Sequence, residues 1–89
     1  MNSFATELES LPEWENLSGK AIVRTFKFEN YYQTMAFVNA VAFIAHGQDH
    51  HPDLQVGYNK CRIEFSTHSA GGLSEKDFEA AREVDALLR

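Results

Sequence analysis

The stretch DHHPDLQVGYNKCRIEFSTHS, residues 49–69, contains two short segments in which apolar and polar side chains alternate. The first alternating segment covers residues 54–58 and the second covers residues 63–67. Alternation with a period of two is typical of half-buried β-strands. Because only Asn59, Lys60 and their neighbours separate the two segments, the stretch predicts an antiparallel hairpin.

A third alternating segment lies upstream at residues 21–28, after the turn residues Ser18 and Gly19. Its even-numbered residues form an apolar face that only Arg24 interrupts, which predicts another strand. The order of elements places one further strand before the Ser18–Gly19 turn.

Between these strands, residues 31–45 repeat apolar side chains at three- and four-residue steps, which predicts a helix with Asn30 as its N-terminal cap. Gly47 is expected to end this helix in a left-handed conformation. The segment is apolar nearly all round, and such a helix is usually buried on more than one side. Since one sheet covers only one face of it, we expect a second subunit to cover part of another.

Ser74 is expected to cap a terminal helix, and a short acidic helix of one or two turns is expected around residues 3–9. The complete order is α-β-β-α-β-β-α with short connections. It predicts a single α+β domain over residues 1–89, with a four-stranded antiparallel sheet and three helices on one face.

The charge balance argues against nucleic acid or an anionic membrane as partners. Thirteen acidic and eight basic residues give a net charge of -5, and the basic residues are scattered along the chain. The longest apolar run, around residues 38–45, is far shorter than the roughly 20 residues that span a bilayer. Cys61 is the single cysteine and the first residues lack the pattern of a signal peptide, so we expect a cytoplasmic protein without a disulfide.

Three of the four histidines, His50, His51 and His68, lie at the two ends of the expected hairpin. The hairpin brings these ends together, and imidazoles exchange protons near neutral pH, so they form a candidate acid/base site. Two alternatives stay open on the residues alone. The histidines are either solvated surface residues, or ligands of a metal ion together with His46, Asp49 and Asp53.

Asp77 and Cys61 each have a structural interpretation. Asp77 stands three residues after the expected cap Ser74, as in a capping box, and is also a candidate partner for a catalytic histidine. Cys61 lies within a predicted strand and is expected to pack in the core rather than to act as a nucleophile.

Taken together, these residues form a recognisable pattern: HHP at 50–52, Tyr58, STH at 66–68, GL at 72–73 and Asp77. This pattern resembles the pterin-4a-carbinolamine dehydratase family, also called 4a-hydroxytetrahydrobiopterin dehydratases, over most of the chain. The resemblance implies a hydro-lyase that converts 4a-hydroxytetrahydropterin into quinonoid dihydropterin, in tetrahydrobiopterin recycling, without a cofactor or metal.

The resemblance also implies which residues form the site. His50 and His68 are expected to transfer the two protons of the reaction, with the division between acid and base left open. His51 is expected to orient the substrate, and Asp77 to orient His68. The implied catalytic set is His50, His51, His68 and Asp77, and the implied substrate-binding set is His50, His51, Pro52, Thr67, His68, Ser69 and Ala70.

Members of this family form dimers or tetramers and act on the product of aromatic amino-acid hydroxylases, so we expect a homo-oligomer and a functional link to such a hydroxylase. The alternative is a non-catalytic protein of the coactivator type, because some members act as dimerisation partners of a homeodomain transcription factor. The chain departs from the family pattern at His46, commonly acidic there, and at Leu54, often aromatic.

Overall fold

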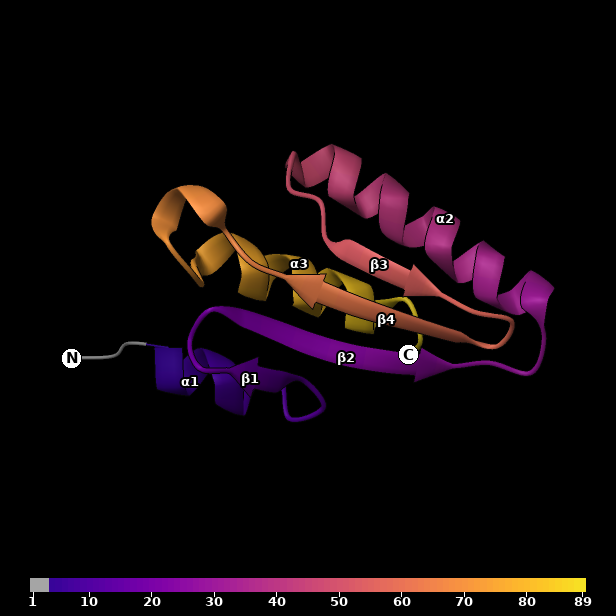
Figure 1. Ribbon diagram of the computed structural model, residues 1–89, viewed down its shortest axis with the longest axis horizontal. Coiled ribbons are helices and arrows are strands. Elements are labelled where there is room, and N and C mark those ends of the chain that lie inside the picture. Colours follow the sequence, from indigo (N-terminus) through magenta and orange to yellow (C-terminus); the bar gives the residue numbers. More distant parts are fainter. Residues whose placement is uncertain (1–3) are drawn as a thin grey trace.

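The computed structural model describes residues 4–89 and contains one antiparallel sheet with helices across one of its faces (Figure 1). The expected order α-β-β-α-β-β-α is confirmed, with Ser3 of the expected first helix lying outside the described residues. The elements are α1 (Phe4–Glu9), β1 (Glu15–Leu17), β2 (Ala21–Lys27), α2 (Tyr31–Gln48), β3 (Asp53–Val56), β4 (Lys60–Phe65), the 3₁₀ turn η1 (His68–Ala70) and α3 (Glu75–Ala86).

The four strands lie in the order β1-β2-β4-β3, so β4 pairs with both β2 and β3. The expected hairpin is β3 with β4, in a register that places Leu54 opposite Ile63. Its turn is closed by the Gly57 N–H, which donates to the Lys60 carbonyl over 2.8 Å. The segment at 63–67 leaves the regular ladder after Phe65, and Thr67 instead forms an isolated bridge with Gly72.

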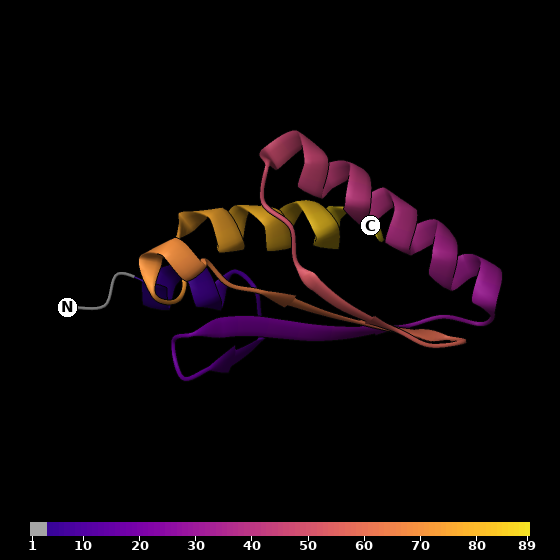
Figure 2. The same cartoon turned by 45° about the horizontal axis from the view of Figure 1, so that its top comes forward.

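Helices α2 and α3 lie across one face of the sheet (Figure 2). The buried apolar side chains of the strands form one core with those of the two helices. Phe78 of α3 and Val41 of α2 are completely buried against this face, and burial of a side chain of this size contributes about 1.5–3 kcal/mol. The sheet contributes these core side chains: Ile22, Phe26, Cys61, Ile63 and Phe65.

Arg24, the exception on the apolar face of β2, has a charged partner on α3. Its Nη1 lies 2.9 Å from Oδ1 of Asp85, and the Trp14 indole N–H donates to the same carboxylate. The guanidinium carbon also lies 4.3 Å from the centre of the Phe26 ring. A charge on the core side of a sheet is tolerated when it is paired in this way, so Arg24 ties β2 to α3.

The start of α2 is as expected, but its end is not. The Asn30 side chain accepts the Gln33 N–H over 2.9 Å and caps the helix. The expectation that Gly47 ends the helix is wrong, because the helix continues to Gln48 and Asp49 takes the left-handed conformation, with φ 53°. Asp tolerates this conformation better than most residues, and the His50 N–H then bonds to the Ala45 carbonyl.

Only one face of α2 is buried, and it is formed by Thr34, Phe37, Val41 and Ala45. Large aromatic side chains lie on the rest of the helix, where Tyr32 is 81% exposed and Phe43 is 78% exposed. The expected second subunit on this surface therefore stays a prediction. Within residues 4–89 no helix is both long and apolar enough to cross a membrane.

Candidate active site

Three segments meet at one end of the sheet: the connection from α2 to β3, the residues that follow β4, and the first turn of α3. They enclose a hollow of about 220 Å³ that we call the histidine pocket. Its lining residues are Asp49, His50, His51, Asp53, Glu64, Ser66, Thr67, His68, Ser69 and Lys76. The structure thus places His50, His51 and His68 around one hollow.

The remaining residues of the expected site lie next to the pocket. Pro52 lines a neighbouring hollow on the α2 side, which also contains His46 and Leu54. Ala70 is exposed in η1, directly after Ser69. Asp77 is fully buried behind His50.

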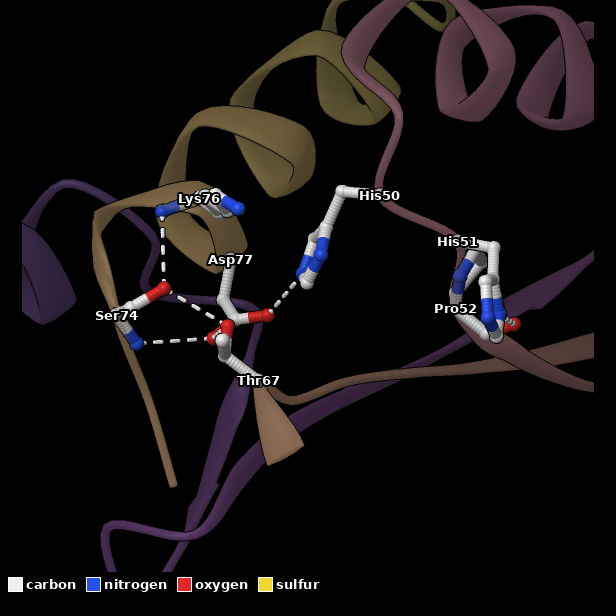
Figure 3. Close-up of polar contacts among 7 residues, drawn as sticks. All are labelled: His50, His51, Pro52, Thr67, Ser74, Lys76 and Asp77. Atoms are coloured by element: carbon white, nitrogen blue, oxygen red, sulfur yellow. Dashed lines mark hydrogen bonds and ion pairs between the residues drawn. The ribbon is translucent and has the colours of Figure 1, made fainter. Parts of the chain in front are cut away.

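His50 is the histidine that the protein holds most firmly. Its Nε2 lies 2.6 Å from Oδ1 of Asp77, and its ring stacks on Phe65 with 6.0 Å between the ring centres and 15° between the planes. Only 12% of the His50 side chain is exposed. Figure 3 shows His50 reaching from the chain after α2 to Asp77 at the start of α3. The ring is therefore restrained in both plane and direction.

Asp77 uses its second carboxylate oxygen to close the start of α3. Its Oδ2 accepts the Ser74 backbone N–H over 2.9 Å and the Thr67 hydroxyl over 2.8 Å. The expected capping box is confirmed, since Ser74 accepts from the first turn of the helix while Asp77 reaches back to the Ser74 N–H. A buried carboxylate is stable only with such donors, and Oδ2 of Asp77 has two of them.

The expectation that Asp77 orients His68 is wrong, because the carboxylate bonds to His50 instead. His68 begins the 3₁₀ turn after β4 and is exposed, and its carbonyl accepts the Gly71 N–H over 3.0 Å. His51 is also exposed, with a contact of 3.4 Å between its Nδ1 and the Pro52 carbonyl. These two imidazoles line the pocket without a buried partner among the described residues.

Charged side chains border the pocket. Asp49, Asp53 and Glu64 contribute carboxylates, and Lys76 contributes an ammonium group. Glu64 is paired with Arg62 over 3.1 Å. Among the residues that the structure describes, no three His, Cys, Asp or Glu side chains are grouped so that they could hold a metal ion.

Two features of the site were missed in the sequence. The Phe65 ring supports His50, and the Thr67 hydroxyl points to Asp77. Phe65 stands two residues after the core residue Ile63, so the alternation of the strand predicts that Phe65 points inward. No pattern in the sequence shows that His50 lies beside it. The inward Thr67 hydroxyl follows only from the position of α3.

Comparison with known proteins supports the resemblance seen in the sequence. The family model for pterin 4 alpha carbinolamine dehydratase matches residues 2–87. The chain belongs to this family. A relative from Nitrosomonas eutropha is 59% identical over 81 residues, which cover 91% of this chain and 72% of that protein. One from Bdellovibrio bacteriovorus is 55% identical over 84 residues, covering 90% and 69% respectively. Both relatives are provisionally named pterin-4-alpha-carbinolamine dehydratase.

Two solved structures share the fold. One from Brucella melitensis, described as a transcriptional coactivator/pterin dehydratase, has a TM-score of 0.88 and 31% identity, covering 97% of this chain and 95% of that one. The other is described as a pterin dehydratase-like protein that is a RuBisCO assembly factor in the alpha-carboxysome. It has a TM-score of 0.72 and 26% identity, covering 84% and 88%. The fold therefore carries different described roles in different proteins.

Proposed function

We propose that this protein is a hydro-lyase that removes water from 4a-hydroxytetrahydropterin and releases quinonoid dihydropterin. The observation that carries the proposal is the histidine pocket, in which three imidazoles line one hollow and one of them is held by a buried carboxylate. Membership of the pterin 4 alpha carbinolamine dehydratase family supports a pterin as the substrate.

The reaction needs two proton transfers and no change of oxidation state. The bond between ring carbon 4a and the hydroxyl oxygen breaks while that oxygen gains a proton and leaves as water. A ring nitrogen loses its proton as the C=N bond forms. Two imidazoles in opposite protonation states carry out both transfers near neutral pH, and exchange with solvent then restores them.

We assign the two transfers to His50 and His68, with His51 orienting the substrate. His50 is restrained by Asp77 and Phe65, whereas His68 lies on the exposed turn after β4. They line the same pocket from two different segments, which suits two reacting groups on one pterin. We propose that the backbone at Pro52, Ser69 and Ala70 contacts the pterin at the pocket edges.

The test is to generate 4a-hydroxytetrahydropterin with an aromatic amino-acid hydroxylase and to follow its ultraviolet decay with and without this protein. Acceleration by the wild type is expected, and its absence would overturn the proposal. His50→Ala and His68→Ala should each lower the rate by about 10²- to 10⁴-fold, the usual contribution of a positioned acid or base. His46→Ala is the control for the loss of an imidazole, because His46 does not line the histidine pocket, although it shares the neighbouring hollow with His50 and His51.

A second candidate function is that of a non-catalytic binding protein. The exposed Tyr32 and Phe43 on α2 favour it, as do the roles described for the two solved relatives. A pure binding protein would leave the decay of the substrate unchanged while still associating through α2. We also propose, on the family resemblance and the single cysteine, a cytoplasmic homo-oligomer that works beside a hydroxylase.

A further inference from the structure

We propose that Thr67 and Ser74 are positioning residues that act through Asp77 to hold His50 in one tautomer. In this tautomer the ring proton is on Nε2, so Nδ1 is the atom that exchanges protons with the substrate. The first part concerns the protein alone, and the statement about substrate rests on the proposed function.

The direction of the hydrogen bonds follows from counting protons. Oγ1 of Thr67 lies 2.8 Å from Oδ2 of Asp77 and 2.7 Å from Oγ of Ser74 (Figure 3). Each hydroxyl has one proton to donate. If Asp77 is ionised, the Thr67 proton goes to its carboxylate, and the Ser74 proton goes to Thr67. Ser74 in turn accepts the Lys76 backbone N–H over 3.3 Å.

The backbone N–H of Ser74 is a donor whatever the direction of the hydroxyl protons, and it favours the ionised form of Asp77. Oδ2 of Asp77 accepts this N–H and also contacts the Thr67 hydroxyl. A fixed donor on a buried oxygen favours the negative carboxylate. The 2.6 Å contact between the other oxygen and His50 then requires the proton to be on Nε2 of the imidazole.

In this arrangement Nδ1 of His50 is available to a substrate in the histidine pocket. It makes no hydrogen bond to another residue in the described part of the chain, and His50 lines the histidine pocket. The neutral ring accepts a proton at Nδ1, and the charged ring donates one from the same atom. Stacking on Phe65 restrains the plane of the ring, and the contact with Asp77 keeps Nε2 turned toward the carboxylate.

Thr67 therefore differs from a residue that touches the pterin with its side chain. It is only 8% exposed, and its hydroxyl is engaged by Asp77 and Ser74. Its bridge with Gly72 fixes the backbone on which this hydroxyl stands.

The first experiment reverses the tautomer with Asp77→Asn. Because the Ser74 N–H and the Thr67 hydroxyl both point to the Oδ2 position, the amide oxygen of the variant should occupy it. The amide NH₂ group then faces His50 Nε2 and donates to it, which moves the ring proton to Nδ1. Two-dimensional ¹H–¹⁵N NMR spectra of the ligand-free protein, recorded where His50 is neutral, distinguish the two tautomers. We expect Nε2–H in the wild type and Nδ1–H in Asp77→Asn.

In the dehydration assay the Asp77→Asn variant should lose kcat by about 10⁴-fold, the loss seen when a catalytic imidazole is held in the wrong tautomer. The second experiment replaces Thr67. Thr67→Val removes the hydroxyl at nearly constant shape and leaves the Asp77 carboxylate with one donor on Oδ2 instead of two. The carboxylate is then free to turn away from His50, so we expect part of the His50 population in the other tautomer. We also expect kcat to fall by about 10- to 100-fold with little change in KM. Thr67→Ser should restore both.

The control for the second experiment is Thr34→Val, which removes the other buried threonine hydroxyl. Thr34 bonds to the Asn30 and Tyr58 carbonyls, away from the pocket. Its loss should lower stability while His50 keeps its tautomer and kcat stays unchanged.

A wild-type spectrum with the neutral-ring proton on Nδ1 would overturn the inference, even if Asp77→Asn does not fold. Unchanged tautomer and kcat in Thr67→Val would remove Thr67 from the positioning role. The expected tautomers without any pterin turnover would refute the proposed function alone. Turnover with His50 in the other tautomer would refute this inference alone.

Discussion

Among single residues, Asp77 has both a structural role and a role in the candidate site, one for each of its carboxylate oxygens. One accepts from Ser74 and Thr67 at the start of α3, and the other contacts His50. Loss of a helix cap costs about 1 kcal/mol, and a buried donor left without its acceptor adds to this cost. A change at this residue therefore affects the stability of α3 and the geometry of the imidazole together.

Cys61 is a core residue, as expected, and its chemistry should reflect that. It is completely buried on β4, and burial raises the pKa of its thiol above the ordinary value. The reactive thiolate therefore forms only at higher pH than in an exposed cysteine. We expect an aromatic disulfide reagent at pH 8 to modify the native protein far more slowly than the urea-unfolded one. Rapid stoichiometric modification of the native protein would contradict this.

Substitution by alanine should change the stability of the protein in opposite directions at Gly47 and Gly72. Gly47 lies inside α2 with open space where an alanine methyl group would stand, so Gly47→Ala should raise the free energy of unfolding by about 0.5–1 kcal/mol. A Cβ on Gly72 would lie 2.8 Å from the Gly19 carbonyl oxygen, where the Leu73 N–H bonds. Gly72→Ala should therefore lower the free energy of unfolding by about 1–3 kcal/mol.

Urea denaturation of both glycine variants and the wild type measures these changes. Dehydration activity should persist in Gly47→Ala, because the substitution touches no residue of the pocket. Equal stability of the two variants would show that the close approach of Gly72 to Gly19 does not constrain the fold.

At the scale of elements, α1 contacts α3 through an aromatic pair and an ion pair, among other contacts. The rings of Phe4 and Phe78 lie 5.0 Å apart, and Nη1 of Arg82 lies 2.8 Å from Oε1 of Glu7. The Arg82 guanidinium, followed by a hydrogen bond from Glu75, holds the pKa of Glu7 below its ordinary value of 4.5. The hydrogen bond with Glu7 in turn raises the pKa of Glu75.

The attachment of α1 should therefore depend on pH through Arg82. A lowered folded-state pKa means that the ionised Glu7 stabilises the fold above pH 4.5, and that this contribution is lost as the pH falls through the folded value. Arg82→Gln should thus be less stable than the wild type at pH 7 and equally stable at strongly acid pH. The difference should be small, because the pair is exposed to solvent and salt.

Thermal unfolding of wild type and Arg82→Gln across the acid range tests this prediction. Arg89→Gln is the control, since Arg89 is exposed and makes no ion pair within residues 4–89. A difference that persists unchanged below the pKa of Glu7 would assign the role of Arg82 to packing of its side chain.

The helices and strands also show which structural features local sequence patterns can predict. Alternation predicted β2, β3 and β4, and the caps Asn30 and Ser74 are correct because a cap depends on residues three or four positions apart. The end of α2 was misplaced at Gly47 because a glycine is compatible with both a helix interior and a left-handed cap. Asp49 became the cap once the chain had to turn toward β3.

At the scale of the whole molecule, the outer surface of α2 predicts self-association. Tyr32 and Phe43 remain largely exposed, although the apolar character of the helix is typical of burial on several sides. We expect light scattering after size-exclusion chromatography to give a dimer or tetramer. Phe43→Asp should shift the protein to smaller species, because association would bury the new charge.

Thr25→Asp serves as the control for self-association, since Thr25 is exposed on β2 rather than on α2. A wild-type monomer at all accessible concentrations would refute the expected oligomer. Equal effects of the two substitutions would place the contact elsewhere than α2.

The α+β order, the hairpin, the caps Asn30 and Ser74 and the family follow from the amino-acid sequence alone, because they depend on period and spacing along the chain. The expected hairpin also predicts that His50, His51 and His68 lie at one end of the sheet. The contact of Asp77 with His50 rather than His68 is visible only in the folded protein. The physical reason is that their contact joins residues 27 positions apart, across the packing of α3 against β4 and the chain after α2. A capping acid is locally the same whether or not its second oxygen meets an imidazole.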